Sequence, residues 1–164
     1  GLVACREFDS VRIAGRGIKA TEGGTEEVRL EDSCINTLRL GWRSWEIELG
    51  MQKRRPGGSV DLPKQATGSD FYQERFDNDR LRRPLSAGAW RDGEKIRPFG
   101  PGGRKKLKKV FAERRVPLRQ RHEIPVIRDA GNEVLWVCGV CRSNQAPLSR
   151  DTVNVLVISA RLQE

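Results

Sequence analysis

Strict alternation of apolar and polar side chains predicts two strands in this chain. The first lies within residues 42–49, where the alternating positions are Trp45, Glu46, Ile47, Glu48 and Leu49. The second lies within residues 153–162, where one face carries Leu156, Ile158, Ala160 and Leu162. A period of two residues is the signature of a strand with one buried face.

Shorter patterns predict further strands, turns and loops. Residues 6–13 indicate a strand with a turn at Asp9-Ser10, and the glycine-rich residues 14–27 indicate a loop. Residues 126–128 and 133–138 flank a turn at 129–132, which is typical of a hairpin. Residues 53–59 read as a turn or linker, and residues 70–81 fit either a strand or a short helix.

A helix is predicted over residues 104–115, directly after the glycine-rich turn at 100–103. On a helical wheel, Leu107, Val110 and Phe111 share one face, with most of the lysines on the other faces. Val116-Pro117 ends this helix, because the residue before proline avoids the helical region. Pro117 suits the first position of a second short helix over residues 118–123, which Pro125 ends.

These elements predict an α+β fold with largely antiparallel strands and two short helices packed on them. A chain of 164 residues fits one domain or two small ones. We expect a strand-rich leading region over residues 1–75, with its inclusion in the following domain left open. Residues 76–164 form the second part. The chain does not begin with Met and has no basic leader before an apolar core. We therefore expect no signal peptide and a fragment of a longer protein.

Positive charge is concentrated in one part of the sequence. Residues 81–128 hold fifteen Lys or Arg and four Asp or Glu, a net charge of +11, although the whole chain carries +9. Such a local excess attracts polyanions, of which nucleic acid is the commonest. A glycine-rich turn that opens a helix also offers backbone N–H groups and a positive dipole end to a phosphate. Phosphate contacts of this kind bind RNA by shape, without reading bases.

Other interpretations of the basic segment, residues 81–128, explain its charge pattern less well. A charged outer face is normal on a surface helix. An anionic membrane would require a stronger apolar face than Leu107, Val110 and Phe111 provide. No nucleophile elbow, zinc-protease motif or phosphate-binding loop is present, and the one histidine, His122, lies among charged residues. We therefore expect no membrane partner and no catalytic residue.

The C-x-x-C pair of Cys138 and Cys141 could bind a metal or act in redox chemistry. A structural zinc site usually needs a second pair of ligands, and redox pairs normally open a helix. Here the pair ends an apolar run that reads as a strand. We expect packing cysteines and no metal, with a zinc or redox site kept as an alternative.

Several motifs occur together in order: 90–100 (WRDGEKIRPFG), 103–111 (GRKKLKKVF), 116–117 (VP), 124–128 (IPVIR), 134–139 (VLWVCG) and 146–147 (AP). In this set the chain resembles the C-terminal domain of bacterial tRNA(Ile)-lysidine synthetase. That family shows an Arg-Pro-x-Gly turn, a Gly-x-Lys-Lys-Leu-Lys-x-x-Phe helix, a Val-Pro stop, a Pro-led strand and a Trp-Val-x-Gly strand. Residues 76–81 also resemble the segment just before it, so the resemblance covers about half of the chain.

The resemblance implies a parent ligase that uses ATP to adenylate the wobble cytidine of an isoleucine tRNA, after which lysine displaces AMP. The Ser-Gly-Gly-x-Asp-Ser loop that binds ATP in that family is absent from this sequence. We therefore expect this chain alone to be inactive and to hold no cofactor. ATP and Mg²⁺ would belong to an absent N-terminal catalytic domain.

The resemblance also implies that this segment grips the tRNA body, chiefly the acceptor stem. The RNA-binding residues carried over by position are Arg97, Arg104, Lys105, Lys106, Lys108, Lys109 and Arg142. Expected partners are an isoleucine tRNA and the catalytic domain, in the cytoplasm, and a homodimer is left open. The alternative is a free-standing RNA-binding or protein-docking module with no enzymatic role.

Overall fold

The computed structural model describes residues 44–55, 57 and 70–163 with their side chains, together with the backbone of four earlier strands. These four are β1 (Val3–Glu7), β2 (Ser10–Ala14), β3 (Val28–Leu30) and β4 (Thr37–Trp42). The later strands are β5 (Trp45–Lys53), β6 (Phe71–Asp77), β7 (Leu85–Gly88), β8 (Lys95–Ile96), β9 (Lys105–Lys106), β10 (Val126–Arg128), β11 (Val134–Val137), β12 (Cys141–Arg142) and β13 (Asn154–Leu162). The helices are α1 (Leu107–Glu113), α2 (Leu118–Arg121) and a 3-10 turn, η1 (Asn78–Arg80).

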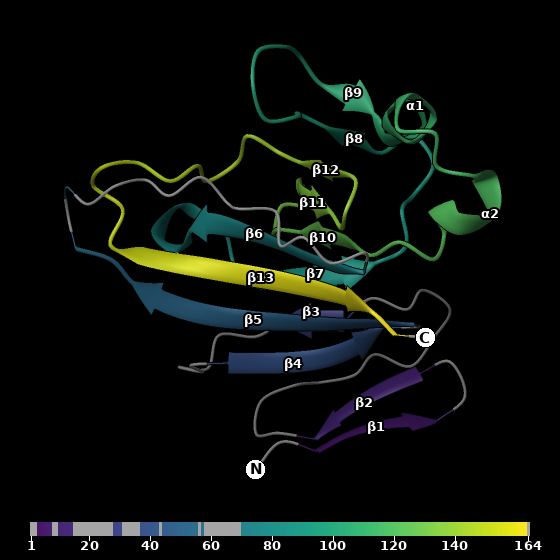
Figure 1. Cartoon of the computed structure of the whole chain (residues 1–164), viewed down its shortest axis with the longest axis horizontal. Helices are drawn as coiled ribbons and strands as arrows, with labels where there is room; N and C mark the ends of the chain where they lie inside the picture. Colours follow the sequence, from purple (N-terminus) through teal and green to yellow (C-terminus); the bar gives the residue numbers. More distant parts are fainter. Residues whose placement is uncertain are drawn as a thin grey trace.

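Two antiparallel sheets form the framework (Figure 1). One has the strand order β4-β5-β13-β6, and the other has the order β12-β11-β10-β7-β3. The last strand, β13, lies between β5 and β6 and pairs with β5 from Asn154↔Lys53 to Leu162↔Trp45. Strands β8 and β9 form a separate antiparallel pair, as do β1 and β2. The predicted α+β class with largely antiparallel strands is confirmed.

The main core lies between the two sheets. The four-stranded sheet contributes Ile47, Phe76 and Ile158, and the five-stranded sheet contributes Ile127 and Leu135. The period of two in β5 is confirmed, because Trp45, Ile47 and Leu49 are buried while Glu46 and Glu48 are half-buried. The strand starts at Trp45 rather than Trp42, which ends β4.

A second core lies on the other face of the five-stranded sheet. In β10, Ile127 enters the main core and Val126 enters the cluster beneath α1. Strand β11, whose pairing with β10 has a register shift, sends Leu135 and Trp136 to the main core and Val134 and Val137 to the other cluster. Together with the buried face of α1, these residues form what we term the outer cluster: Ile96, Leu107, Val110, Phe111, Val126, Val134 and Val137. The five-stranded sheet is therefore covered on both faces, and β8, β9, α1 and α2 form a third layer.

The predicted helix over residues 104–115 begins later than its sequence indicates. Lys105 and Lys106 are extended and form β9, which pairs with β8: Lys106 lies opposite Lys95, and Lys105 lies opposite Ile96. Helix α1 therefore begins at Leu107. The predicted buried face of Leu107, Val110 and Phe111 is confirmed. The physical reason for the late start is tertiary pairing, which satisfies backbone groups that an additional helical turn would otherwise use.

Helix α1 ends at Glu113, two residues before the predicted end at residue 115 and before the predicted stop at Val116-Pro117. Arg115 adopts the left-handed conformation (φ 56°), and the Val116 N–H donates to the Phe111 carbonyl at 2.9 Å. The Arg115 N–H donates to the Ala112 carbonyl at 3.0 Å, which completes a Schellman motif. Pro117 then caps α2 at its N-cap position rather than occupying its first helical position, and α2 ends at Arg121.

The other sequence patterns correspond to the structure as follows. The hairpin of β10 and β11 forms as predicted, with Asn132 at positive φ in its turn. Residues 71–77 form a strand. Residues 6–13, predicted as a strand with a turn at Asp9-Ser10, contribute to two antiparallel strands, β1 and β2, and Ser10 belongs to β2 rather than to a turn. The loop predicted at 14–27 and the turn or linker at 53–59 lie largely outside the described residues. The division at residue 75 stays a prediction and falls within β6.

Within the residues that the structure describes, no helix is long and apolar enough to cross a membrane.

Candidate nucleic-acid interface

The third layer, which consists of β8, β9, α1 and α2, carries most of the basic segment. Figure 1 shows these elements gathered at one end of the molecule, on the side of the five-stranded sheet away from β4, β5 and β13. Because the apolar face of α1 is buried in the outer cluster, its polar side chains face solvent. Residues 95–112 hold seven Lys or Arg and no Asp or Glu.

Six of the seven predicted RNA-binding residues are exposed in this layer: Arg97, Arg104, Lys105, Lys106, Lys108 and Lys109. They follow one another through the β8–β9 connection, β9 and the first turn of α1. Lys95, Arg114, Arg115 and Arg119 are exposed in the same layer. We refer to these ten residues as the basic surface.

Two residues of the basic surface are held by weak ion pairs. Arg104 contacts Glu133 at 2.7 Å, and Lys105 contacts Glu113 at 3.1 Å, with half-exposed side chains in both pairs. Surface pairs of this kind contribute about 0–1 kcal/mol and are screened by salt, so a phosphate can compete for either cation. Among the described residues, Arg97, Lys106, Lys108 and Lys109 have no ion-pair partner.

Two arginines of the basic segment are not available to a ligand. Arg121 is buried, donates to the Val116 carbonyl at 3.1 Å and lies over the Phe111 ring. Arg128 has no exposed surface and forms an ion pair with Glu94. The net charge of residues 81–128 therefore overstates the charge that a ligand can contact, because charge counting along a sequence ignores burial.

Arg142 differs from the other predicted site residues. Its guanidinium lies between the rings of Phe76, at 4.5 Å, and Phe99, at 5.0 Å. It contacts Glu74 at 3.3 Å and donates to the carbonyls of Arg75 and Ser143. The desolvation that accompanies burial lowers the pKa of Arg142 and raises the pKa of Glu74. Its assignment to RNA binding stays a prediction, and its contacts within the fold account for its position.

Glu94, which sequence reasoning did not single out, joins the third layer to the sheet. Its carboxylate accepts hydrogen bonds from the Arg128 side chain and from the Arg91 N–H. Its backbone carbonyl accepts from the N–H of Leu107, the first residue of α1, at 2.8 Å. One of the N–H groups that we expect at a phosphate site at the start of this helix is therefore already satisfied within the fold.

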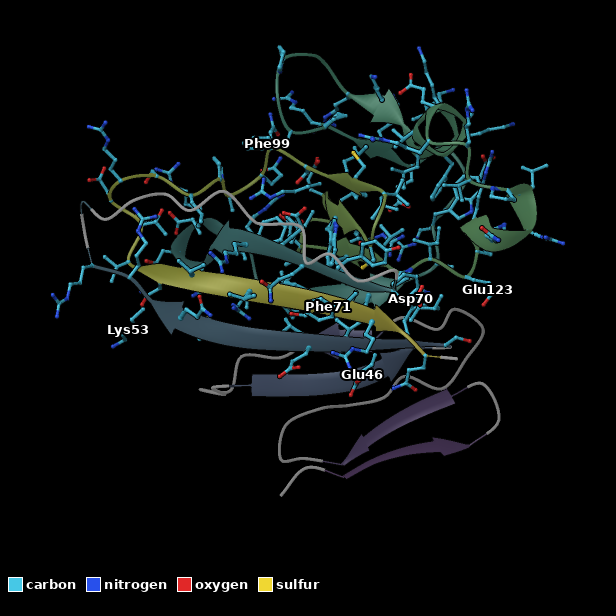
Figure 2. All side chains as sticks on the ribbon, viewed as in Figure 1. Glu46, Lys53, Asp70, Phe71, Phe99 and Glu123 are labelled. Carbon is cyan, nitrogen blue, oxygen red and sulfur yellow. The ribbon has the colours of Figure 1, made fainter. Side chains whose placement is uncertain are left out.

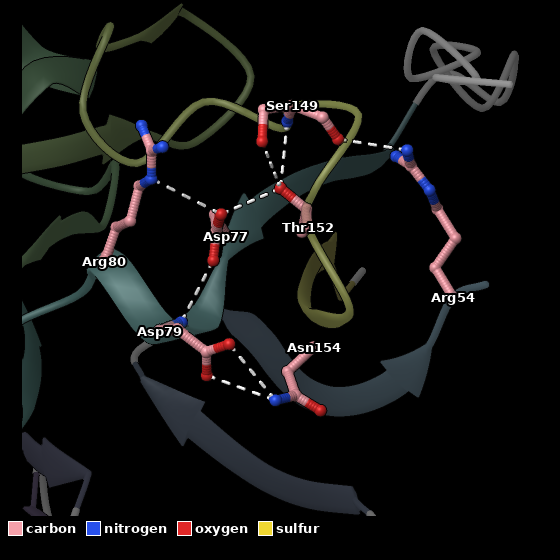
Figure 3. Close-up of polar contacts among 7 residues, drawn as sticks. All are labelled: Arg54, Asp77, Asp79, Arg80, Ser149, Thr152 and Asn154. Carbon is pink, nitrogen blue, oxygen red and sulfur yellow. Dashed lines mark hydrogen bonds and ion pairs between the residues drawn. The ribbon is translucent and has the colours of Figure 1, made fainter. Parts of the chain in front are cut away.

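A polar network at the C-terminal end of β6 accounts for the polar residues of the motif at 76–81 (Figure 3). The buried Asp77 accepts from Thr152 Oγ1 at 2.8 Å and from the Asp79 N–H at 3.1 Å. Thr152 Oγ1 in turn accepts from the Ser149 N–H, and Asn154 donates to Asp79. These bonds fix the loop before β13 to the end of β6, which gives the motif a structural role.

The two cysteines of the C-x-x-C pair lie on opposite faces of the five-stranded sheet. Cys138 is buried in the main core, and Cys141 packs against the outer cluster. Burial raises the pKa of the Cys138 thiol well above its usual value and raises that of Cys141. Metal binding and redox attack require the thiolate, which a raised pKa disfavours. Among the described residues, no three His, Cys, Asp or Glu side chains gather as metal ligands would.

Comparison with known proteins gives one family. The family model described as "TilS substrate C-terminal domain" matches residues 85–158. The chain is 33% identical over 131 residues to the tRNA(Ile)-lysidine synthase of Geobacillus kaustophilus, covering 73% of this chain and 28% of that protein. It is 33% identical over 87 residues to the enzyme of the same name from Caldanaerobacter subterraneus, covering 53% of this chain and 18% of that protein.

A solved structure titled "Crystal structure of TILS C-terminal domain" shares the fold, with a TM-score of 0.60 and 24% sequence identity. The superposition covers 74% of this chain and 86% of that one. The chain spans less than a third of the length of these two curated relatives.

Proposed function

Because residues 85–158 belong to the family of TilS substrate C-terminal domains, we propose that this chain is the tRNA-binding portion of a tRNA(Ile)-lysidine synthase. The observation that carries the proposal is the basic surface. It lies within the matched residues, and residues 95–112 include no acidic side chain that would repel a phosphate.

The basic surface suits a ribose-phosphate backbone better than it suits a base-reading site. Its cations lie on short connected elements, where long and flexible Lys and Arg side chains can each reach a different phosphate. Such contacts follow the shape of an A-form helix and carry no sequence information by themselves. We therefore assign to this layer the grip on a duplex part of the tRNA, with the acceptor stem as the part that it contacts.

The ligation itself is assigned to the remainder of the parent enzyme. In this proposal ATP, Mg²⁺ and lysine bind to a catalytic portion outside this chain, in the cytoplasm, and lysine is joined there to the wobble cytidine. A mixture of this chain with tRNA, ATP, Mg²⁺ and lysine should contain no lysidine by mass spectrometry. Formation of lysidine in that mixture would contradict the assignment.

Replacing Lys108 and Lys109 together with alanine should weaken binding to tRNA about tenfold or more. Both side chains are exposed, and each is expected to neutralise about one phosphate. The slope of log K against log salt should therefore become shallower by about two units. The fold should be nearly unaffected, because surface changes usually alter stability by about 0.5 kcal/mol or less. Fluorescence titration at several salt concentrations measures both quantities.

Lys53→Ala combined with Arg150→Ala is the matched control. Both residues are exposed, lie outside the basic surface and together carry the same charge; Figure 2 shows Lys53 at the far end of β5. This control should leave the salt slope nearly unchanged. Equal losses in the two double variants would indicate a general effect of net charge and would contradict a localised interface.

A further inference from the structure

One large aromatic side chain of the third layer is exposed where a folded domain would normally bury it. Phe99, in the β8–β9 connection, has 60% of its surface exposed. Figure 2 shows it on the side of this connection that faces the chain after β12. A single exposed apolar residue is unremarkable on its own. Phe99 differs because its backbone and its ring are both fixed in place.

The backbone of Phe99 is held by pairing with the end of β12. Its N–H donates to the Arg142 carbonyl at 2.9 Å, and Pro98 bridges to Ser143. The Asn144 N–H donates to the Arg97 carbonyl at 2.9 Å. Phe99 and the two residues before it are thus part of a short antiparallel contact with residues 142–144, so the Phe99 backbone is positioned before any ligand binds.

The ring of Phe99 is held by the Arg142 guanidinium. That guanidinium lies 5.0 Å from the Phe99 ring centroid and 4.5 Å from the ring of the fully buried Phe76. Glu74 and two backbone carbonyls fix Arg142 in turn. Part of the Phe99 side chain is therefore supported from within the fold, and the exposed remainder is free to contact a ligand.

The surroundings of Phe99 determine which ligand fits. Arg97 lies two residues before it, and Arg104 to Lys106 follow the glycine-rich turn. Gly100 and Gly102 adopt φ values of 102° and 134°, and a Cβ at either position would meet no atom within 4 Å. An exposed aromatic ring that is flanked in sequence by exposed cations combines the two features of single-stranded nucleic-acid binding: stacking for a base and charge for its phosphates.

We propose that Phe99 is a stacking platform for an unpaired nucleobase of the bound RNA. This inference rests on the proposed function, because it adds a base contact to the phosphate contacts of the basic surface. Duplex RNA offers no exposed base face except at its ends, so the platform would bind where a helix ends and a single strand continues. A tRNA has such a junction at the top of its acceptor stem.

The test compares two RNA hairpins of identical duplex, one blunt and one with a short unpaired 3′ tail. The full chain should bind the tailed hairpin more tightly. Phe99→Ala should weaken binding of the tailed hairpin by roughly five- to a hundredfold, the range expected for the loss of one base stack, and leave the blunt hairpin within about twofold. Phe99→Trp should restore the preference, because a larger ring stacks equally well, whereas Phe99→Leu should not.

A spectroscopic readout separates stacking from a structural role of the side chain. 2-Aminopurine placed in the tail next to the duplex should lose fluorescence on binding to the unmodified chain and not on binding to Phe99→Ala. Leu118→Ala is the matched control, because Leu118 is 73% exposed on the same layer and should affect neither hairpin. Melting temperatures of all variants confirm that each is folded.

The outcomes distinguish this inference from the proposed function. Failure of the unmodified chain to bind either hairpin or tRNA would overturn both. Equal binding of the two hairpins, with no effect of Phe99→Ala, would overturn the platform and leave the proposed function in place. If Phe99→Ala weakened binding to the parent's catalytic portion and left RNA binding unchanged, Phe99 would be assigned to protein docking. That result would also overturn the platform.

Discussion

Replacing Glu94 with glutamine should lower the free energy of unfolding by about 3–5 kcal/mol. The change keeps the size of the side chain and removes its charge. It leaves the Arg128 guanidinium, which has no exposed surface, without a counter-charge. The hydrogen bonds that Arg128 still donates to the carbonyls of Ala89 and Val126 offset only part of the loss.

Glu133→Gln is the control for this prediction. It removes a carboxylate from the exposed pair with Arg104 and should cost about 1 kcal/mol or less. The double variant Glu94→Gln with Arg128→Met should recover part of the stability, because no buried charge remains unpaired. Urea denaturation with linear extrapolation measures all three variants. Equal costs for Glu94→Gln and Glu133→Gln would show that the Glu94–Arg128 pair is not buried as described.

Replacing Phe111 with alanine should lower the free energy of unfolding by about 3–5 kcal/mol as well. Phe111 has no exposed surface, occupies the outer cluster and contacts the ring of Trp90 edge-on at 5.7 Å. Its loss leaves a cavity in the outer cluster beneath α1. Because α1 carries Lys108 and Lys109, we also expect tRNA binding to weaken in this variant under conditions where it remains folded.

Lys109→Ala, two residues earlier on the exposed side of α1, gives the comparison. It should change stability by about 0.5 kcal/mol or less and weaken tRNA binding. Phe111→Ala should therefore lower the free energy of unfolding much more than Lys109→Ala does. If Lys109→Ala destabilised the chain more than Phe111→Ala, the assignment of the helix faces would be wrong.

The sequence predicts those parts of the fold whose determinants are local. The buried face of α1, the hairpin of β10 and β11, and the helix stop at Val116-Pro117 each depend on residues close in sequence. The period of two in β5 and β13 likewise indicates strands. It does not indicate that β13 lies between β5 and β6, because strand order depends on which distant segments pair.

Two features of the candidate site depend on such distant contacts and could not be read from the sequence. Lys105 and Lys106 extend as a strand because Lys95 and Ile96 pair with them, although lysine favours helices. Arg128 and Arg142 look like surface cations in sequence, yet Glu94 and Glu74 hold them inside the fold. A basic residue can be assigned to a ligand surface only after its internal partners are known.

Some arginines of the candidate interface are buried and hold its elements in place, whereas others are exposed to solvent. The buried pair of Glu94 and Arg128 fixes the loop before β8, and the backbone carbonyl of Glu94 fixes the start of α1. Arg142 likewise contacts the ring of Phe99 in the β8–β9 connection. Buried cations therefore hold the layer in place, and exposed cations remain available for phosphates.

The measurement that tests the account most directly is binding of the chain to an isoleucine tRNA and to a noncognate tRNA across a salt series. With about five phosphate contacts, the slope of log K against log salt should be on the order of −4 for both. A steep slope with little preference between the tRNAs would support a backbone grip by the basic surface. A flat slope, or no binding at low salt, would contradict it and assign the basic surface to another acidic partner.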